Sequence, residues 1–118
     1  MYGTPNAEHS PYRISSNSIE KNDSSGKLIE FPLLTTRFLG KKIPAAGGFY
    51  LRTLPTNVIK NAIKNYEKKG MLATFYIHSW ELTPEFMPRL DLPLKDKFVT
   101  YHNLDKAYSR MSQLLKHF

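Results

Sequence analysis

Three side chains at the end of an apolar run could do chemistry. The run Met71–His78 ends in a histidine, and Trp80 and Glu81 follow directly. Histidine exchanges protons near neutral pH, and a neighbouring tryptophan can form an apolar wall or a platform for a sugar ring. Catalytic groups gather at the carboxyl ends of strands in parallel α/β sheets, so this position predicts a catalytic His78. A histidine that only bonds to backbone at a strand end is the alternative, and spacing leaves both open.

The rest of the chain offers little catalytic equipment. Its four histidines never occur at i,i+3, i,i+4 or in an H-x-H arrangement, so no metal site of its own is predicted. The absence of cysteine excludes disulfides and thiolate zinc sites. Gly47-Gly48 matches neither nucleotide-binding glycine pattern, and no G-x-S-x-G nucleophile motif occurs.

The segments around the apolar run predict an α/β fold. Unbroken apolar character over Met71–His78 suits a strand buried on both faces of a parallel sheet. A helix at about 55–69 precedes it, with an apolar stripe at helical spacing and Gly70 to end it. A loop with three prolines follows the run, and then a short strand over Phe98–Tyr101. A second long helix is predicted at 103–117, with Asn103 as its cap.

The first third of the chain is less regular. Residues 1–27 are predicted to be largely loop, because clusters of serine, asparagine and aspartate favour turns, with a short strand at Tyr12–Ile14. Lys27–Phe31 is a better strand, Leu33–Ile43 has no clear period, and Pro44–Gly48 is a loop. With 118 residues the chain corresponds to one domain, with an ordered core over 28–118, and is too short for a complete (β/α) barrel.

Charge and hydropathy exclude other classes of protein. The net charge is +7, yet Met71–Lys97, which contains His78, is the one stretch with more acidic than basic residues, so a nucleic-acid-binding function is not predicted. No apolar run approaches 18 residues, so no membrane span is expected. Met1–Pro5 has no signal-peptide character, and the compartment is left open.

Three ordered motifs carry a resemblance to a known family. They are Gly47–Pro55, Phe75–Glu81 and Tyr101–Leu104, with Glu30 and Pro32 as a weaker fourth landmark. They resemble the pattern G-G-x-[FY]-x-R-x-x-P, then Y-x-H-P-W-E, then a tyrosine with Asn-Leu at the start of the last helix. This is the pattern of the C-terminal region of polysaccharide deacetylases, in the exopolysaccharide-associated branch of carbohydrate esterase family four. Ser79 departs from it, since the family has proline there.

The resemblance implies a deformed (β/α) barrel, of which this chain would be the C-terminal portion. Such enzymes hold a metal, usually zinc, whose bound water attacks the acetamido group of an N-acetylated polysaccharide. By its place, His78 matches the histidine that protonates the leaving amine. Residues that would line the substrate pocket or support the acid are Gly47, Gly48, Tyr50, Arg52, Trp80 and Glu81.

The family's metal-binding residues have no counterpart in this sequence and would lie N-terminal to Met1. We therefore expect no cofactor in this chain, no deacetylation by the isolated chain, and a missing N-terminal barrel half as its partner. Uncovered strand edges and apolar faces predict rearrangement or self-association. The alternative function is a non-catalytic glycan-binding or assembly module that completes a deacetylase on another chain.

Overall fold

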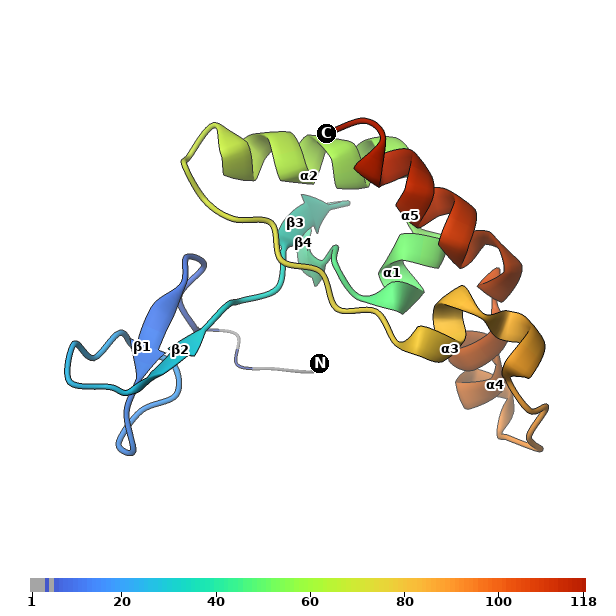
Figure 1. The fold of residues 1–118 in the computed structure, drawn as a ribbon, viewed down its shortest axis with the longest axis horizontal. Coiled ribbons are helices and arrows are strands. Elements are labelled where there is room, and N and C mark those ends of the chain that lie inside the picture. The colour runs from blue at the N-terminus through green and yellow to red at the C-terminus, as the bar shows by residue number, and fades with distance from the viewer. Residues whose placement is uncertain (1–3, 5) are drawn as a thin grey trace.

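The structure, a computed structural model, describes residue 4 and residues 6–118. The fold is mixed α/β, with two separate two-stranded antiparallel sheets and a set of helices (Figure 1). The absence of signal-peptide character is predicted for Met1–Pro5, of which Met1–Gly3 and Pro5 lie outside the described residues. Among the helices of the described ranges, none combines the length and the apolar character that crossing a membrane requires.

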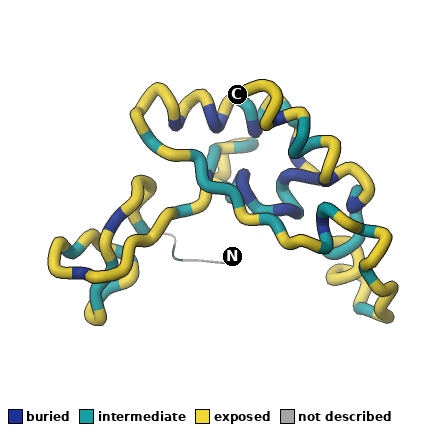
Figure 2. Tube along the Cα trace, in the orientation of Figure 1, coloured by how far each residue is buried: buried dark blue, intermediate teal, exposed yellow. Residues whose placement is uncertain are grey.

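The first sheet is a hairpin that stands apart from the helices (Figure 1). Strand β1 (Tyr12–Ile14) pairs with β2 (Leu28–Glu30), with Tyr12 opposite Glu30. Both strands are predicted by the sequence, whereas their pairing is not. All three residues of β2 are exposed, and most of this region is exposed in Figure 2. The hairpin therefore has almost no core.

The second sheet corrects one expectation. Residues 33–43, expected to be irregular, form most of a hairpin of β3 (Thr35–Phe38) and β4 (Lys41–Pro44). Leu39 and Gly40 make its turn, and both have positive φ (49° and 76°). The sequence pattern is weak here because β3 has no fully buried residue and alternates no apolar face against solvent.

Helix α2 (Thr56–Glu67) confirms the predicted helix at 55–69, and Gly70 follows it with φ +66°. The predicted apolar stripe faces inward and packs over β3 and α5 (Ala107–Leu115), and α1 (Gly48–Thr53) packs against α5. These elements enclose the core, visible as dark blue segments in Figure 2. The buried core residues are Leu34, Ala45, Ala46, Leu51, Leu54, Ile59, Ala62, Ile63, Tyr66 and Leu114.

The apolar run before His78 is extended but is not the predicted strand buried on both faces. It forms only two isolated parallel bridges, Leu33 with Thr74 and Gly47 with Tyr76. Side chains at alternate positions (71, 73, 75 and 77) pack against the core, whereas Leu72 and Tyr76 are more than half exposed. The parallel direction of pairing agrees with the prediction. The predicted burial of both faces is wrong, because only one face of the segment meets the core.

The segment after His78 is more helical than predicted. The expected proline-rich loop contains α3 (Ser79–Leu82) and the short 3₁₀ helix η1 (Pro84–Phe86). The predicted strand Phe98–Tyr101 is wrong, because these residues end helix α4 (Leu94–Tyr101), whose preceding residue is Pro93. None of the eight residues of α4 is buried, so burial on a sheet does not decide their conformation.

The predicted helix at 103–117 is shorter and begins differently. It starts as the 3₁₀ helix η2 (Leu104–Lys106) and continues as α5. Asn103 precedes η2 but makes no side-chain cap bond, contrary to the prediction, and it has a left-handed backbone conformation (φ 50°, ψ 31°). Its side chain is used elsewhere, as described below.

Candidate functional site

Helix α1 presents two residues of the first motif on one face. Gly48 and Arg52 are four residues apart, so one turn of helix places them side by side, and both are buried. Gly47 precedes the helix in an extended conformation, and its carbonyl accepts a hydrogen bond from the Leu51 N–H (2.9 Å). Leu51 on the same helix is fully buried in the core and fixes the helix there.

Arg52 forms a buried ion pair with Glu81. Its Nη2 and Nε donate to the same carboxylate oxygen, Oε1, at 2.9 and 3.2 Å. The side chains are only 1% and 2% exposed. Burying either charge alone would cost much free energy. The two side chains, which come from separate motifs, can therefore be buried here only as a pair.

Gly48 leaves the space that the Glu81 carboxylate occupies. A Cβ on Gly48 would lie 1.9 Å from Glu81 Oε2 and 2.1 Å from Oε1. A larger residue could be accommodated only by moving a buried, paired carboxylate. The second glycine of the Gly-Gly pair is therefore required by close packing and has no need of an unusual backbone conformation.

Arg52 also binds the end of α4. Nη1 donates to the carbonyls of His102 (2.6 Å) and Thr100 (3.3 Å), and Nη2 donates to that of Val99 (3.1 Å). The last carbonyls of a helix have no partner within the helix, so a guanidinium satisfies them well. Asn103 Nδ2 in turn donates to the Arg52 carbonyl (3.3 Å), which joins the third motif to the first.

His78 lies on the outer side of the same carboxylate. Its backbone N–H and its Nδ1 lie 3.1 and 3.2 Å from Glu81 Oε2. A carboxylate only accepts hydrogen bonds, so Nδ1 carries a proton in this arrangement. The His78 side chain is 46% exposed, and its other nitrogen, Nε2, lies 3.1 Å from the Tyr76 hydroxyl. The geometry holds Nδ1 against the buried carboxylate and places Nε2 beside the hydroxyl of Tyr76, a residue that is more than half exposed.

Aromatic rings flank His78. Trp80 stacks on the imidazole at 5.2 Å between ring centroids with an interplanar angle of 24°. Tyr76 meets the imidazole edge-on at 4.8 Å and 70°. His78 is therefore constrained by a carboxylate at Nδ1 and by rings at its face and edge.

The structure joins most of the predicted site residues but not all. Gly48, Arg52 and Glu81 lie beneath His78, and Trp80 lies against it. Gly47 is near by virtue of its bridge with Tyr76. Tyr50 instead packs against the core and meets Phe49 edge-on.

Tyr76 and Asn103 are site residues to which the sequence assigned no such contact. Tyr76 precedes His78 by two positions in an extended segment, so both side chains fall on the same face. That period-two relation is a signal that could have been used. The contact of Asn103 with Arg52 has no comparable signal, because the two residues are 51 positions apart.

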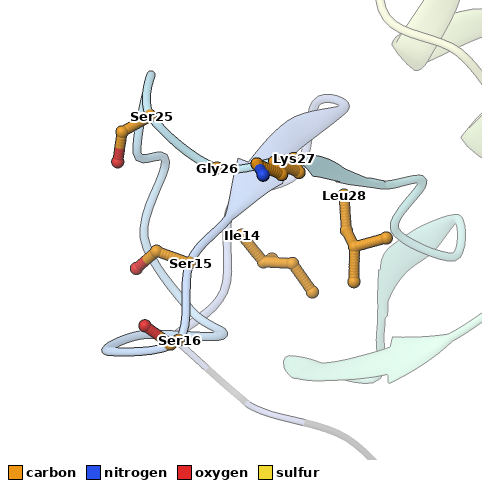
Figure 3. Close-up of a pocket in the computed structure, with 7 residues that line it drawn as sticks. All are labelled: Ile14, Ser15, Ser16, Ser25, Gly26, Lys27 and Leu28. Atoms are coloured by element: carbon orange, nitrogen blue, oxygen red, sulfur yellow. The ribbon is translucent and has the colours of Figure 1, made fainter.

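No cluster of three or more histidine, aspartate or glutamate side chains suited to hold a metal occurs in the described part of the chain. A cavity of about 450 Å³ lies in the β1–β2 region, away from His78, and Figure 3 shows its lining. Its walls are serines, aliphatic side chains and one lysine, with no acid or imidazole. The residues are Ile14, Ser15, Ser16, Ser25, Gly26, Lys27 and Leu28.

Comparison with known families matches residues 1–118 to a family described as Domain of unknown function (DUF3473). The chain belongs to this family. The match includes all three motifs that meet at the Arg52–Glu81 pair, so the site lies wholly within the DUF3473 domain. No curated protein and no solved structure matches the chain.

Proposed function

We propose that this DUF3473 chain is the C-terminal part of a polysaccharide deacetylase, a fragment of a deformed barrel, and that His78 is its general acid. The substrate class is an N-acetylated polysaccharide. The motif resemblance suggests the reaction, and one observation supports the role of His78: a buried carboxylate engages its Nδ1, while the side chain as a whole is half exposed and its Nε2 lies beside the Tyr76 hydroxyl.

That geometry suits proton donation to an amine. In imidazolium form, His78 keeps one proton at Nδ1, hydrogen-bonded to Glu81, and can donate the other from Nε2. When the amide C–N bond breaks, the nitrogen takes the bonding electron pair and the Nε2 proton, and leaves as a neutral amine. Neutral His78 then retains the Nδ1 proton. The carboxylate holds the imidazole in place by accepting from Nδ1–H throughout, as in other carboxylate–histidine pairs.

The residues that hold the metal in such deacetylases have no counterpart here, and the described residues hold no metal-binding cluster. The described residues therefore do not fit a metal site, and the part that we propose for them in the reaction is confined to the proton and its surroundings. Nucleophile activation would belong to another segment or another chain.

A complementation assay tests the proposal. The 118-residue chain is mixed with a separately produced N-terminal half of a deacetylase of this branch, and zinc-dependent acetate release from an acetylated glycan is measured. We expect no release by the chain alone and release by the mixture. His78→Ala should lower the rate about 100-fold or more, the range of a lost general acid.

His117→Ala is the matched control, since His117 is an exposed histidine in the last residues of the chain. It should leave the rate of the mixture unchanged. A mixture with His78→Ala that kept the full rate would refute the role of His78 as general acid. Acetate release by the isolated chain would refute the proposal that the nucleophile is activated by another segment or chain.

Exposed apolar side chains favour the alternative, an assembly module that completes a deacetylase on another chain. β2 exposes Leu28 and Ile29, and α4 exposes Leu94 and Phe98, each by more than half. Such surfaces mark sites of association. The complementation assay separates the two functions: a purely assembling chain would restore the rate even with His78→Ala. Light scattering of the isolated chain reports self-association.

A further inference from the structure

Arg52 and Glu81 lie beneath His78, and their buried polar atoms all have hydrogen-bond partners. Among the described residues no buried side-chain nitrogen or oxygen lacks a hydrogen-bond partner. Within the described part of the chain the two carboxylate oxygens have different partners: Oε1 accepts from Arg52, and Oε2 accepts from the backbone N–H and Nδ1 of His78. The orientation of the carboxylate toward His78 is thus set by the arginine on its other side.

The same arrangement decides which tautomer His78 adopts. A neutral imidazole can carry its proton on either nitrogen, and free histidine favours Nε2–H. Here the acceptor Oε2 lies at Nδ1, so the Nδ1–H form is favoured, and Nε2 then accepts a hydrogen bond from the Tyr76 hydroxyl. A carboxylate that could rotate away would lose this selection.

We propose that Arg52 is a positioning residue for His78, acting through Glu81 to fix the tautomer and orientation of the imidazole. Arg52 is itself fixed by the α4 carbonyls of Val99 and Thr100 and by that of His102. The position of α4 therefore affects the imidazole through the side chains of Arg52 and Glu81. The importance of Arg52 for catalysis rests on the proposed function, whereas its effect on the tautomer and orientation of His78 does not.

Nuclear magnetic resonance of ¹⁵N-labelled histidine in the whole chain tests the proposal without any deacetylation. Above about pH 9, where free imidazole is neutral, two-bond and three-bond couplings identify the protonated ring nitrogen. The His78 signals are assigned by their loss in His78→Gln. We expect the Nδ1–H form in the wild-type chain, and in Arg52→Lys a ratio of Nδ1–H to Nε2–H that falls about threefold or more.

Arg110→Lys is the matched control. Arg110 Nη1 donates to the carbonyls of Leu51 and Leu54 at the end of α1 (3.0 and 2.8 Å), so this variant also removes an arginine from carbonyls at a helix end but makes no change at Glu81. It should leave the tautomer ratio as in the wild type. An equal change in both variants would mean general loosening and would overturn the proposal.

Two further measurements decide the matter should Arg52→Lys not fold. The wild-type spectrum is the first, because an Nε2–H form of His78 there would overturn the proposal outright. Glu81→Gln is the second; it keeps the size of the side chain and should shift the ratio toward Nε2–H. An unchanged ratio in Glu81→Gln would also overturn it. Failure of the complementation assay alone would refute the proposed function and leave this positioning role standing.

Discussion

The helical body (helices α1 to α5 with the β3–β4 sheet) and the β1–β2 hairpin contain the same kinds of contact but bury them to different extents. Each contains an arginine that binds backbone carbonyls and a buried glycine that allows a close approach. In the body, Arg52 is 1% exposed, is paired with a carboxylate and joins three motifs. In the hairpin, Arg13 is exposed and donates one bond, to the Gly26 carbonyl (3.1 Å). Burial therefore makes the same side chain structural in one region and marginal in the other.

The largest difference is expected on removing the two arginines. Arg52→Met leaves Glu81 buried without its partner and should lower the free energy of unfolding by about 3–5 kcal/mol. Arg13→Met removes one partly exposed hydrogen bond and should cost about 1 kcal/mol or less. Urea denaturation of both variants measures this difference, and equal losses would contradict the comparison.

The two glycines should differ in how far their effects spread. In Gly48→Ala the new Cβ displaces the Glu81 carboxylate, and we expect a loss of about 1–3 kcal/mol across the helical body. In Gly26→Ala the new Cβ meets the Ile14 carbonyl, 2.2 Å away, and should unpair only the hairpin. Amide hydrogen exchange of α2 reports the distinction: faster exchange is expected in Gly48→Ala alone.

Asn103 should show a smaller effect within the body. Asn103→Ala places a residue with a poor left-handed preference at φ 50° and also removes the bond to the Arg52 carbonyl, at a cost of about 1–2 kcal/mol. Asn103→Gly removes the same bond but relieves the backbone, and should cost less. Thermal unfolding of the pair checks this order, and the reverse order would show that backbone conformation is not what asparagine supplies here.

The smallest effect concerns the hairpin at low pH. Hydrogen bonds from the hydroxyl and the N–H of Ser25 (2.6 and 2.9 Å) lower the pKa of Asp23 below its ordinary value of 3.8. A lowered pKa in the folded state means that the carboxylate stabilises the turn above the unfolded pKa and that this is lost as pH falls through the folded pKa. Amide exchange near Ser25 should accordingly show a pH dependence below about pH 4 that Asp23→Asn lacks.

Helices α2 and α4 differ in how well the sequence predicts them, because local contacts decide the first and distant contacts hold the second. Helix α2 was predictable because its apolar stripe repeats at helical spacing and Gly70 ends it, both of which are local properties. The second half of α4, Phe98–Tyr101, is predicted to be a strand, and phenylalanine, valine, threonine and tyrosine do favour strands in general. In the structure α4 has no buried face, and its last carbonyls are bound by an arginine that lies 47 to 50 positions earlier. No local pattern contains that contact.

From the sequence alone it follows that His78, Trp80 and Glu81 adjoin an extended apolar segment, and that Gly48 and Arg52 belong to one motif. These relations are short-range and follow from spacing along the chain. The packing of the folded chain shows in addition that Arg52 and Glu81, 29 positions apart, form one buried ion pair, and that Gly48 leaves room for it. The physical reason is that two opposite charges can be buried only together, and which two meet depends on how α1 and α3 pack.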